Sequence, residues 1–182
     1  MKGQNFHSVL WALAELRGQE FRDAVLTNVV GEAGDALRYG TLLSSNLYPV
    51  AWYRDLFHAA LAKVPESPTF ARDVGKVSAA RDVKGVYRIV FRALSTETLV
   101  KQSGRLFKLF YEGGQVDVQE VRSGFARVRY SECRGFDRNL WLDLLGGSEG
   151  VLTAAGARDL RFRIEAGGGD GHDHLQATVT WA

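Results

Sequence analysis

The chain has 182 residues, 46% of them hydrophobic and 11% aromatic, which is enough for one globular domain with a sizeable core. Its 23 basic and 21 acidic side chains leave a net charge of only +2. A single cysteine, Cys133, excludes an internal disulfide and a cysteine-based zinc cluster. These numbers favour one protein domain in a reducing compartment.

The distribution of charge and apolar residues excludes two further classes. The densest basic group, Arg122 to Arg134, is interleaved with Glu120 and Glu132, so no continuous basic stripe is available for a nucleic acid. The N-terminal segment lacks the apolar core of a signal peptide, and the longest apolar runs are only a few residues long. We therefore expect a cytoplasmic protein with no membrane span and no nucleic-acid partner.

The first half of the chain, residues 1–94, is predicted to be helical. Residues 8–17 are apolar and helix-prone, and Gly18 can end this helix. Phe21, Val25 and Val29 then recur at intervals of four, which is the spacing of one helical face. Glycines interrupt the sequence that follows, which predicts short helices and turns there.

Prolines mark the starts of the next two predicted helices. Pro49 lies near the first turn of one of them, and Ser67–Pro68 begins a long helix that is expected to reach about Leu94. Gly75 and Gly85 weaken the long helix. Glycine inside a helix commonly lets a neighbour approach closely, so these positions predict either a packed helix pair or a kink.

The second half, residues 95–182, has a regular pattern of helix, hairpin, helix and hairpin. Ser95 begins a helix that is predicted to run to about Tyr111. Alternating apolar residues then predict two strands joined by a turn at Ser123–Gly124. Asp137 has the position and the side chain of a helix cap.

The helix that begins after Asp137 is expected to reach about Leu145, to end or kink at Gly146–Gly147, and to resume briefly. Two more alternating segments flank a glycine-rich turn at 166–173 and predict a second hairpin. We therefore predict an α+β fold in a single domain, 1–182. In it an antiparallel sheet of about four strands, arranged as hairpins, packs on a helical layer.

Apolar, aromatic and glycine residues along nearly the whole chain follow the order of a known superfamily. They are Leu47-Tyr48-Pro49 with Trp52 and Leu56, the helix end from Phe107 to Gly114, the strand end from Tyr130 to Phe136, Leu144-Leu145-Gly146-Gly147 with Ala155-Gly156, and Trp181. The chain thus resembles the superfamily of 4-vinyl-reductase-type domains, small vesicle-tethering (TRAPP) subunits and haem-NO-binding domains, and within it a myxobacterial paralogous family of unknown function. The resemblance implies a module that binds haem, a tetrapyrrole-like or small hydrophobic ligand, or a partner protein.

The sequence departs from the cofactor-binding members of this superfamily. Haem-NO-binding domains use a proximal histidine and a Tyr-x-Ser-x-Arg signature, whereas the segment from Tyr130 to Arg134 has these residue types at a different spacing. His58 is the only histidine on the long predicted helices. The 4-vinyl-reductase-type domains tend to carry several cysteines and histidines, and Cys133 stands alone here. We therefore predict no cofactor.

Candidate ligand-binding residues are single chemically distinctive or aromatic side chains. They are Cys133, His58, Trp52, Phe107 and Phe110. Arg129 and Arg134 could lower the thiol pKa of Cys133, but a free cysteine is more often a small buried hydrophobe. His58 could ligate haem from an apolar helix face, or it is a structural histidine. The aromatic residues could line an apolar pocket between helices and sheet, or a dimer face.

Asp170, His172 and His174 form the single cluster of histidine and aspartate. Imidazole and carboxylate groups are good ligands for zinc or nickel. The cluster lies among four glycines, however, and such a loop is not preorganised for a metal. We interpret it as a solvated turn.

No set of residues has the spacing of a known catalytic motif. The glycine pairs are not followed by Lys-Ser/Thr as in a phosphate loop, and no Gly-x-Ser-x-Gly elbow occurs. We predict a non-enzymatic interaction or sensor module that forms a homodimer or binds a protein partner, with a small hydrophobic ligand as a further option. Two alternatives stay open: a haem or tetrapyrrole sensor, and a metalloenzyme that uses His172 and His174.

Overall fold

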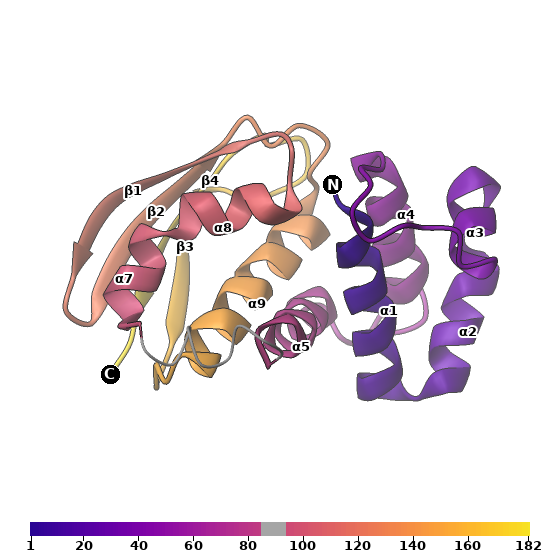
Figure 1. The fold of residues 1–182 in the computed structure, drawn as a ribbon, viewed down its shortest axis with the longest axis horizontal. Helices are drawn as coiled ribbons and strands as arrows, with labels where there is room; N and C mark the ends of the chain where they lie inside the picture. The colour runs from indigo at the N-terminus through magenta and orange to yellow at the C-terminus, as the bar shows by residue number, and fades with distance from the viewer. Residues whose placement is uncertain (85–93) are drawn as a thin grey trace.

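The computed structural model describes residues 1–84 and 94–182 and shows an α+β fold (Figure 1). The N-terminal helices are α1 (Gly3–Arg17), α2 (Gln19–Asn28), α3 (Gly31–Arg38), α4 (Val50–Leu61) and α5 (Phe70–Lys84). The second half contains α7 (Thr96–Lys101), α8 (Ser103–Phe110), β1 (Gln115–Arg122), β2 (Phe125–Ser131), α9 (Arg138–Ala154), β3 (Arg161–Gly167) and β4 (Leu175–Thr180). The predicted fold class is confirmed.

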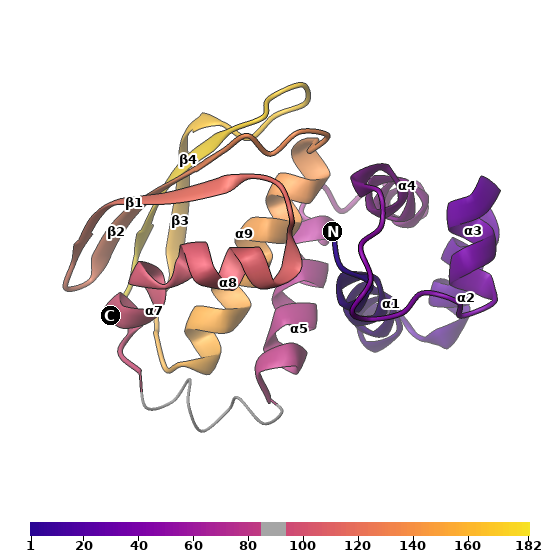
Figure 2. The same ribbon diagram turned by 45° about the horizontal axis from the view of Figure 1, so that its top comes forward.

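The sheet consists of two hairpins, as predicted, with the strand order β1-β2-β4-β3 and antiparallel pairing throughout. The hairpins join where β2 pairs with β4, so that Val128 lies between Val118 and Ala177. Ala126 and Val128 turn inward and are buried, while Arg129 on the same strand is exposed. Helices α7, α8 and α9 lie on one side of this sheet, and α5 packs on α9, so that α1 to α4 are further from the sheet (Figure 2).

Helices α5 and α9 cross at very short range. A Cβ atom at Gly75 would overlap the backbone oxygen of Asp143, and one at Gly146 would overlap the backbone oxygen of Arg72. Gly150 makes the same kind of approach to α5 one turn further along α9. Of the two alternatives for Gly75, a packed helix pair or a kink, the structure shows the packed pair. The prediction for Gly85 falls outside the described residues.

The predicted ends of several helices need correction. Helix α9 runs without interruption through Gly146–Gly147, because contact with α5 compensates for the low helix propensity of glycine. The predicted helix from Ser95 to Tyr111 is two helices that meet at Gln102. Helix α1 begins at Gly3 rather than at residue 8, and α5 begins at Phe70, two residues after Pro68. The predicted extension of α5 towards Leu94 falls in the range that is not described.

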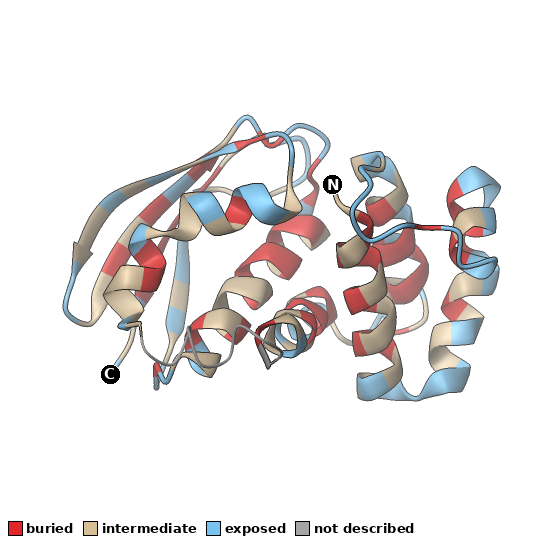
Figure 3. Cartoon of the chain, in the orientation of Figure 1, coloured by how far each residue is buried: buried red, intermediate tan, exposed pale blue. Residues whose placement is uncertain are grey.

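The core is one continuous cluster of buried side chains. It runs from Phe6 on α1 through Leu56 on α4 and Val74 on α5 to Trp141 on α9 and Leu175 on β4. Figure 3 shows that the buried residues lie along the facing sides of the helices and the sheet. None of the helices within the described ranges combines the length and apolarity needed to cross a membrane.

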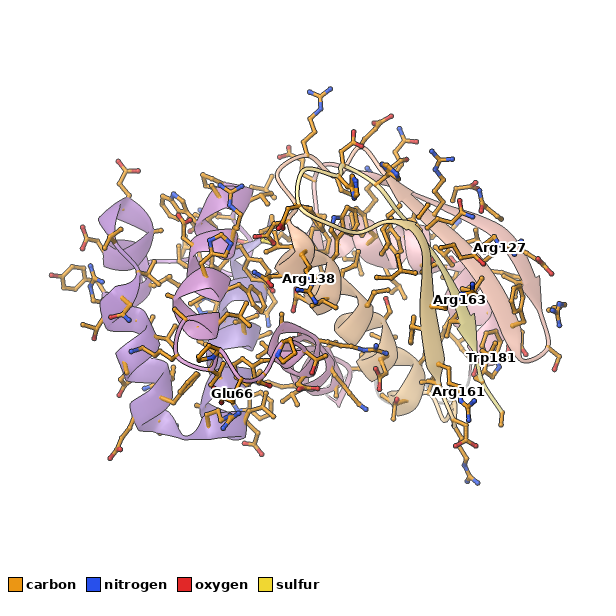
Figure 4. The ribbon with its side chains drawn as sticks, turned by 180° about the vertical axis from the view of Figure 1, so that it is seen from behind. Glu66, Arg127, Arg138, Arg161, Arg163 and Trp181 are labelled. Atoms are coloured by element: carbon orange, nitrogen blue, oxygen red, sulfur yellow. The ribbon has the colours of Figure 1, made fainter. Side chains whose placement is uncertain are left out.

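The outer face of the sheet carries arginines from both hairpins. Arg127 on β2 and Arg163 on β3 pair with Thr178 of β4 from its two sides, and both are labelled in Figure 4. Arg127 forms ion pairs with Glu120 at 3.3 Å and with Glu165 at 3.0 Å. Opposite charges are therefore mixed on this face, and the expected lack of a nucleic-acid partner stays a prediction.

Candidate functional site between the helices and the sheet

Asp143 is a buried carboxyl in an otherwise apolar part of α9. Its side chain is enclosed where α9 crosses α5, and the residue is only 5% exposed. The Tyr53 hydroxyl on α4 donates a hydrogen bond to Asp143 Oδ2 at 3.1 Å. Burial raises the pKa of Asp143 to about 7, although the hydrogen bond from Tyr53 opposes this rise. The carboxyl therefore changes its protonation near neutral pH.

An aromatic cluster adjoins this carboxyl. Phe107 stacks on Tyr111 with ring centroids 4.4 Å apart, and Trp141 lies 4.7 Å from Phe136 and 6.5 Å from Tyr130. Trp141 is fully buried, and its indole N–H has no acceptor within the described part of the chain. Burial raises the pKa values of Tyr111 and Tyr130, and the charge of Asp143 raises that of Tyr111 further. The interior thus combines neutral hydroxyls, one unsatisfied donor and one titrating carboxyl.

Cys133 lies beside the aromatic cluster, as a small buried group. A Cβ at Gly114 would lie 2.8 Å from the Cys133 sulfur and 3.1 Å from the Phe107 ring, so these two predicted site residues are neighbours. Burial, together with the charge of Asp173, raises the pKa of the Cys133 thiol to about 12. The expectation that arginines lower this pKa is wrong, because desolvation of the thiolate dominates.

His58 and Trp52 lie apart from this interior. The His58 side chain is 53% exposed, and its Nε2 lies 2.7 Å from Asp137 Oδ2. The other Asp137 oxygen accepts a hydrogen bond from the Leu140 backbone and caps α9, as predicted. Trp52 is half-buried and stacks on Tyr48 with centroids 5.8 Å apart. Phe110 is also half-buried, and its carbonyl accepts a hydrogen bond from the backbone of Lys2.

The histidines near the C-terminus lie in an exposed turn whose polar groups are satisfied locally. His172 Nδ1 accepts a hydrogen bond from the Gly169 backbone at 3.1 Å, and Asp170 Oδ1 accepts one from the Arg138 backbone at 2.9 Å. His174 Nδ1 lies 3.3 Å from its neighbour Asp173. In residues 1–84 and 94–182 no group of three or more His, Cys, Asp or Glu side chains is placed to hold a metal ion. This arrangement favours the solvated turn.

The helical layer, the close α5–α9 crossing and the four-stranded antiparallel sheet together define a known class of fold. It is that of the haem-NO/oxygen-binding (H-NOX) domains, which represent one branch of the superfamily that the sequence resembles. No protein-family model matches the sequence, and no curated protein matches it.

Three solved H-NOX structures match this chain over its full length. One is an oxygen complex of an H-NOX domain related to soluble guanylate cyclases, with 16% identity, a TM-score of 0.73 and coverage of 100% of this chain and 95% of that chain. The A71G mutant from K. algicida has 14% identity, a TM-score of 0.74 and coverage of 100% and 97%. A triple mutant from S. oneidensis has 14% identity and a TM-score of 0.74, with coverage of 100% of this chain and 96% of that chain. At this identity the similarity shows the fold alone.

The donor groups of this chain do not fit a histidine-ligated haem in the interior. His58 is engaged with Asp137, and His7 Nε2 lies 2.8 Å from the backbone oxygen of Leu42. The two remaining histidines lie in the exposed turn. The interior instead presents a protonated thiol, neutral tyrosines and the carboxyl of Asp143, which are not imidazole donors.

The interior residues that sequence reasoning missed are Asp143 and Tyr53. Asp143 is one of 21 acidic residues in the sequence and belongs to no catalytic motif. One local signal could have identified it, because it interrupts the apolar run from Leu140 to Leu145 on a predicted helix. Its partner Tyr53 lies 90 positions away in the sequence. No local pattern could have paired the two.

Proposed function

We propose that this chain is a non-enzymatic sensor domain with the H-NOX fold. The observation that carries the proposal is the full-length similarity to H-NOX structures, one of which is an oxygen complex. These comparisons favour the sensor interpretation over a general interaction module. They support haem as the first ligand to test, since the similar structures include an oxygen complex of an H-NOX domain and a study of haem redox potential.

The side chains of the interior favour Asp143, rather than a haem, as the group through which the sensor responds to its signal. The Asp143–Tyr53 hydrogen bond connects α9 to α4, and Asp143 also touches α5 at Gly75. A ligand or a proton that changes the charge of Asp143 therefore acts on three helices at once. Because the α5–α9 contact is between backbones, a small change at Asp143 is transmitted as a movement of whole helices.

Haem titration of the purified protein tests which ligand the sensor uses. We expect that haem titration gives no histidine-dependent Soret band that saturates at one haem per chain. The spectra of His58→Ala should therefore match those of the unmodified protein. His172→Ala is the matched control, since this residue lies in the exposed turn. A stoichiometric Soret band that His58→Ala abolishes would establish the haem sensor instead. Native mass spectrometry of protein purified from its own host reports any other ligand that it retains.

A further inference from the structure

A hollow of about 670 Å³ lies in the N-terminal helical part of the molecule, away from the interior described above. It is bounded by α1, α2 and α3, by the segment after α3 and by one side chain of α5. Figures 1 and 2 show α1, α2 and α3 in the same part of the molecule. We call it the α1–α3 hollow, and its main lining residues are Leu10, Trp11, Arg22, Leu26, Leu37 and Arg81. Its volume is in the range of small-ligand sites.

The wall of the α1–α3 hollow has an apolar part and a polar part. Besides the two arginines, the polar part consists of Gln4, His7, Gln19 and Ser44. Leu10, Trp11 and Leu26 are half-buried, since one side of each packs against the core and the other borders the hollow. Leu37 on α3 is buried at the opposite wall. The apolar part of the wall favours a ligand with an apolar body, because burying that body removes hydrocarbon surface from water. The polar part favours a ligand that also carries a polar group.

One cation is available at the edge of the hollow. The Arg81 guanidinium lies over the Trp11 ring, 4.7 Å from its centroid, and makes no ion pair with any carboxylate of the described residues. The adjacent carboxylate, Asp82, is turned towards α1, where it accepts hydrogen bonds from Ser8 at 2.8 Å and Gln4 at 3.2 Å. Arg22 is already paired with Asp23 at 2.6 Å. Arg81 is therefore the group that can receive an anion.

We infer that the α1–α3 hollow binds a small amphipathic anion, a carboxylate with a flat apolar body. The body lies against Leu10 and Leu26 beside Trp11, and the carboxylate meets the guanidinium of Arg81, which presents two parallel donors to such a group. A polyanion fits poorly, because Asp82 and Asp23 lie beside the two arginines. The inference does not depend on which ligand the interior of the domain uses.

Calorimetric titration with 2-naphthoate, compared with the neutral 2-naphthalenemethanol, tests the inference. We expect one 2-naphthoate to bind per chain and Arg81→Gln to weaken it at least about tenfold, as the loss of a charge-assisted hydrogen bond predicts. The neutral alcohol should bind more weakly and should not respond to Arg81→Gln. Arg163→Gln on the outer face of the sheet is the matched control and should leave the affinity unchanged (Figure 4).

A second variant tests the location without removing charge. Ala14 also lines the hollow, so Ala14→Leu should fill part of it and block 2-naphthoate while Arg81 stays in place. Absence of saturable binding to the unmodified protein, or equal affinity in Arg81→Gln and the unmodified protein, would overturn the inference.

Discussion

Asp143 is a side chain whose environment strongly disfavours its charged form. It is fully enclosed, its one hydrogen-bond donor is the neutral hydroxyl of Tyr53, and no cation of the described residues pairs with it. A buried carboxylate in such surroundings is costly unless it takes up a proton. Strongly shifted groups of this kind cluster at functional sites, which is why we place the signal group of the proposed sensor here.

The stability of the protein should fall as the pH rises from about 4 to about 7 and level off above that. The pKa of Asp143 is about 7 in the folded state against an ordinary value of 3.8, so the folded state holds the proton more tightly. Its contribution to stability is therefore complete below pH 3.8 and is lost as the pH rises through about 7. Urea unfolding midpoints between pH 5 and 8 should show this decline, and Asp143→Asn should flatten it.

Two further variants make this pH experiment specific. Burial also raises the pKa of Asp82, so Asp82→Asn is the control, and it should retain the decline near pH 7 that belongs to Asp143. Tyr53→Phe removes the hydrogen bond that lowers the pKa of Asp143 and should move the decline to higher pH. An unchanged slope in Asp143→Asn would show that another group causes the pH dependence.

At the level of elements, the α5–α9 crossing holds the helical layer to the second half of the chain. Its short separation depends on glycines whose missing Cβ atoms leave room for the backbone of the other helix. Gly146 faces the backbone of Arg72 directly, whereas the neighbouring Gly147 has only ordinary contacts, the nearest at 3.8 Å to Ala79 Cβ. The two adjacent glycines therefore have different structural roles.

Gly146→Ala should destabilise the protein strongly, while Gly147→Ala should not. The added methyl at 146 overlaps backbone that cannot move without separating the helices, which we expect to cost roughly 2 to 4 kcal/mol. At 147 the same change gains helix propensity, up to about 1 kcal/mol, without a clash. Chemical denaturation of the two variants measures this difference. Equal stabilities would mean that the crossing can readjust.

At the scale of the whole molecule, the exposed apolar side chains lie mainly at the N-terminal end. Val30, Tyr39 and Leu43 are 80%, 78% and 61% exposed, and all three lie between α2 and α4. Large apolar side chains that gather in this way commonly mark an interaction surface. They lie in the segments that flank α3 rather than within a helix, and this surface is where we test the predicted homodimer.

Light scattering at micromolar concentration should report a dimer that Tyr39→Lys converts to a monomer. The lysine introduces a charge that must be desolvated in the predicted interface. Leu109→Lys is the control, since this residue is 55% exposed but lies on α8. A monomeric unmodified protein would remove the predicted homodimer and leave a different protein as the partner.

The sequence alone determined the class of fold and the order of most helices and strands, because both follow from local patterns, but not where several helices begin and end. Helical spacing, caps such as Asp137 and alternation in the strands express interactions between residues that are close in the chain. Gly75 left a packed helix pair or a kink open, and only the tertiary structure shows that α9 is the partner of α5. Of the predicted site residues, Cys133 and Phe107 are brought together, whereas His58 and Trp52 lie elsewhere.

Only the tertiary structure decided the chemistry of the interior. The pairing of Asp143 with Tyr53, and the meeting of Arg127 and Arg163 across β4, join residues from distant parts of the chain. The pKa of Cys133 rises because the fold buries its sulfur, although charged residues precede and follow it in the sequence. Burial and electrostatic environment are properties of the packed molecule, so no local pattern could have specified them.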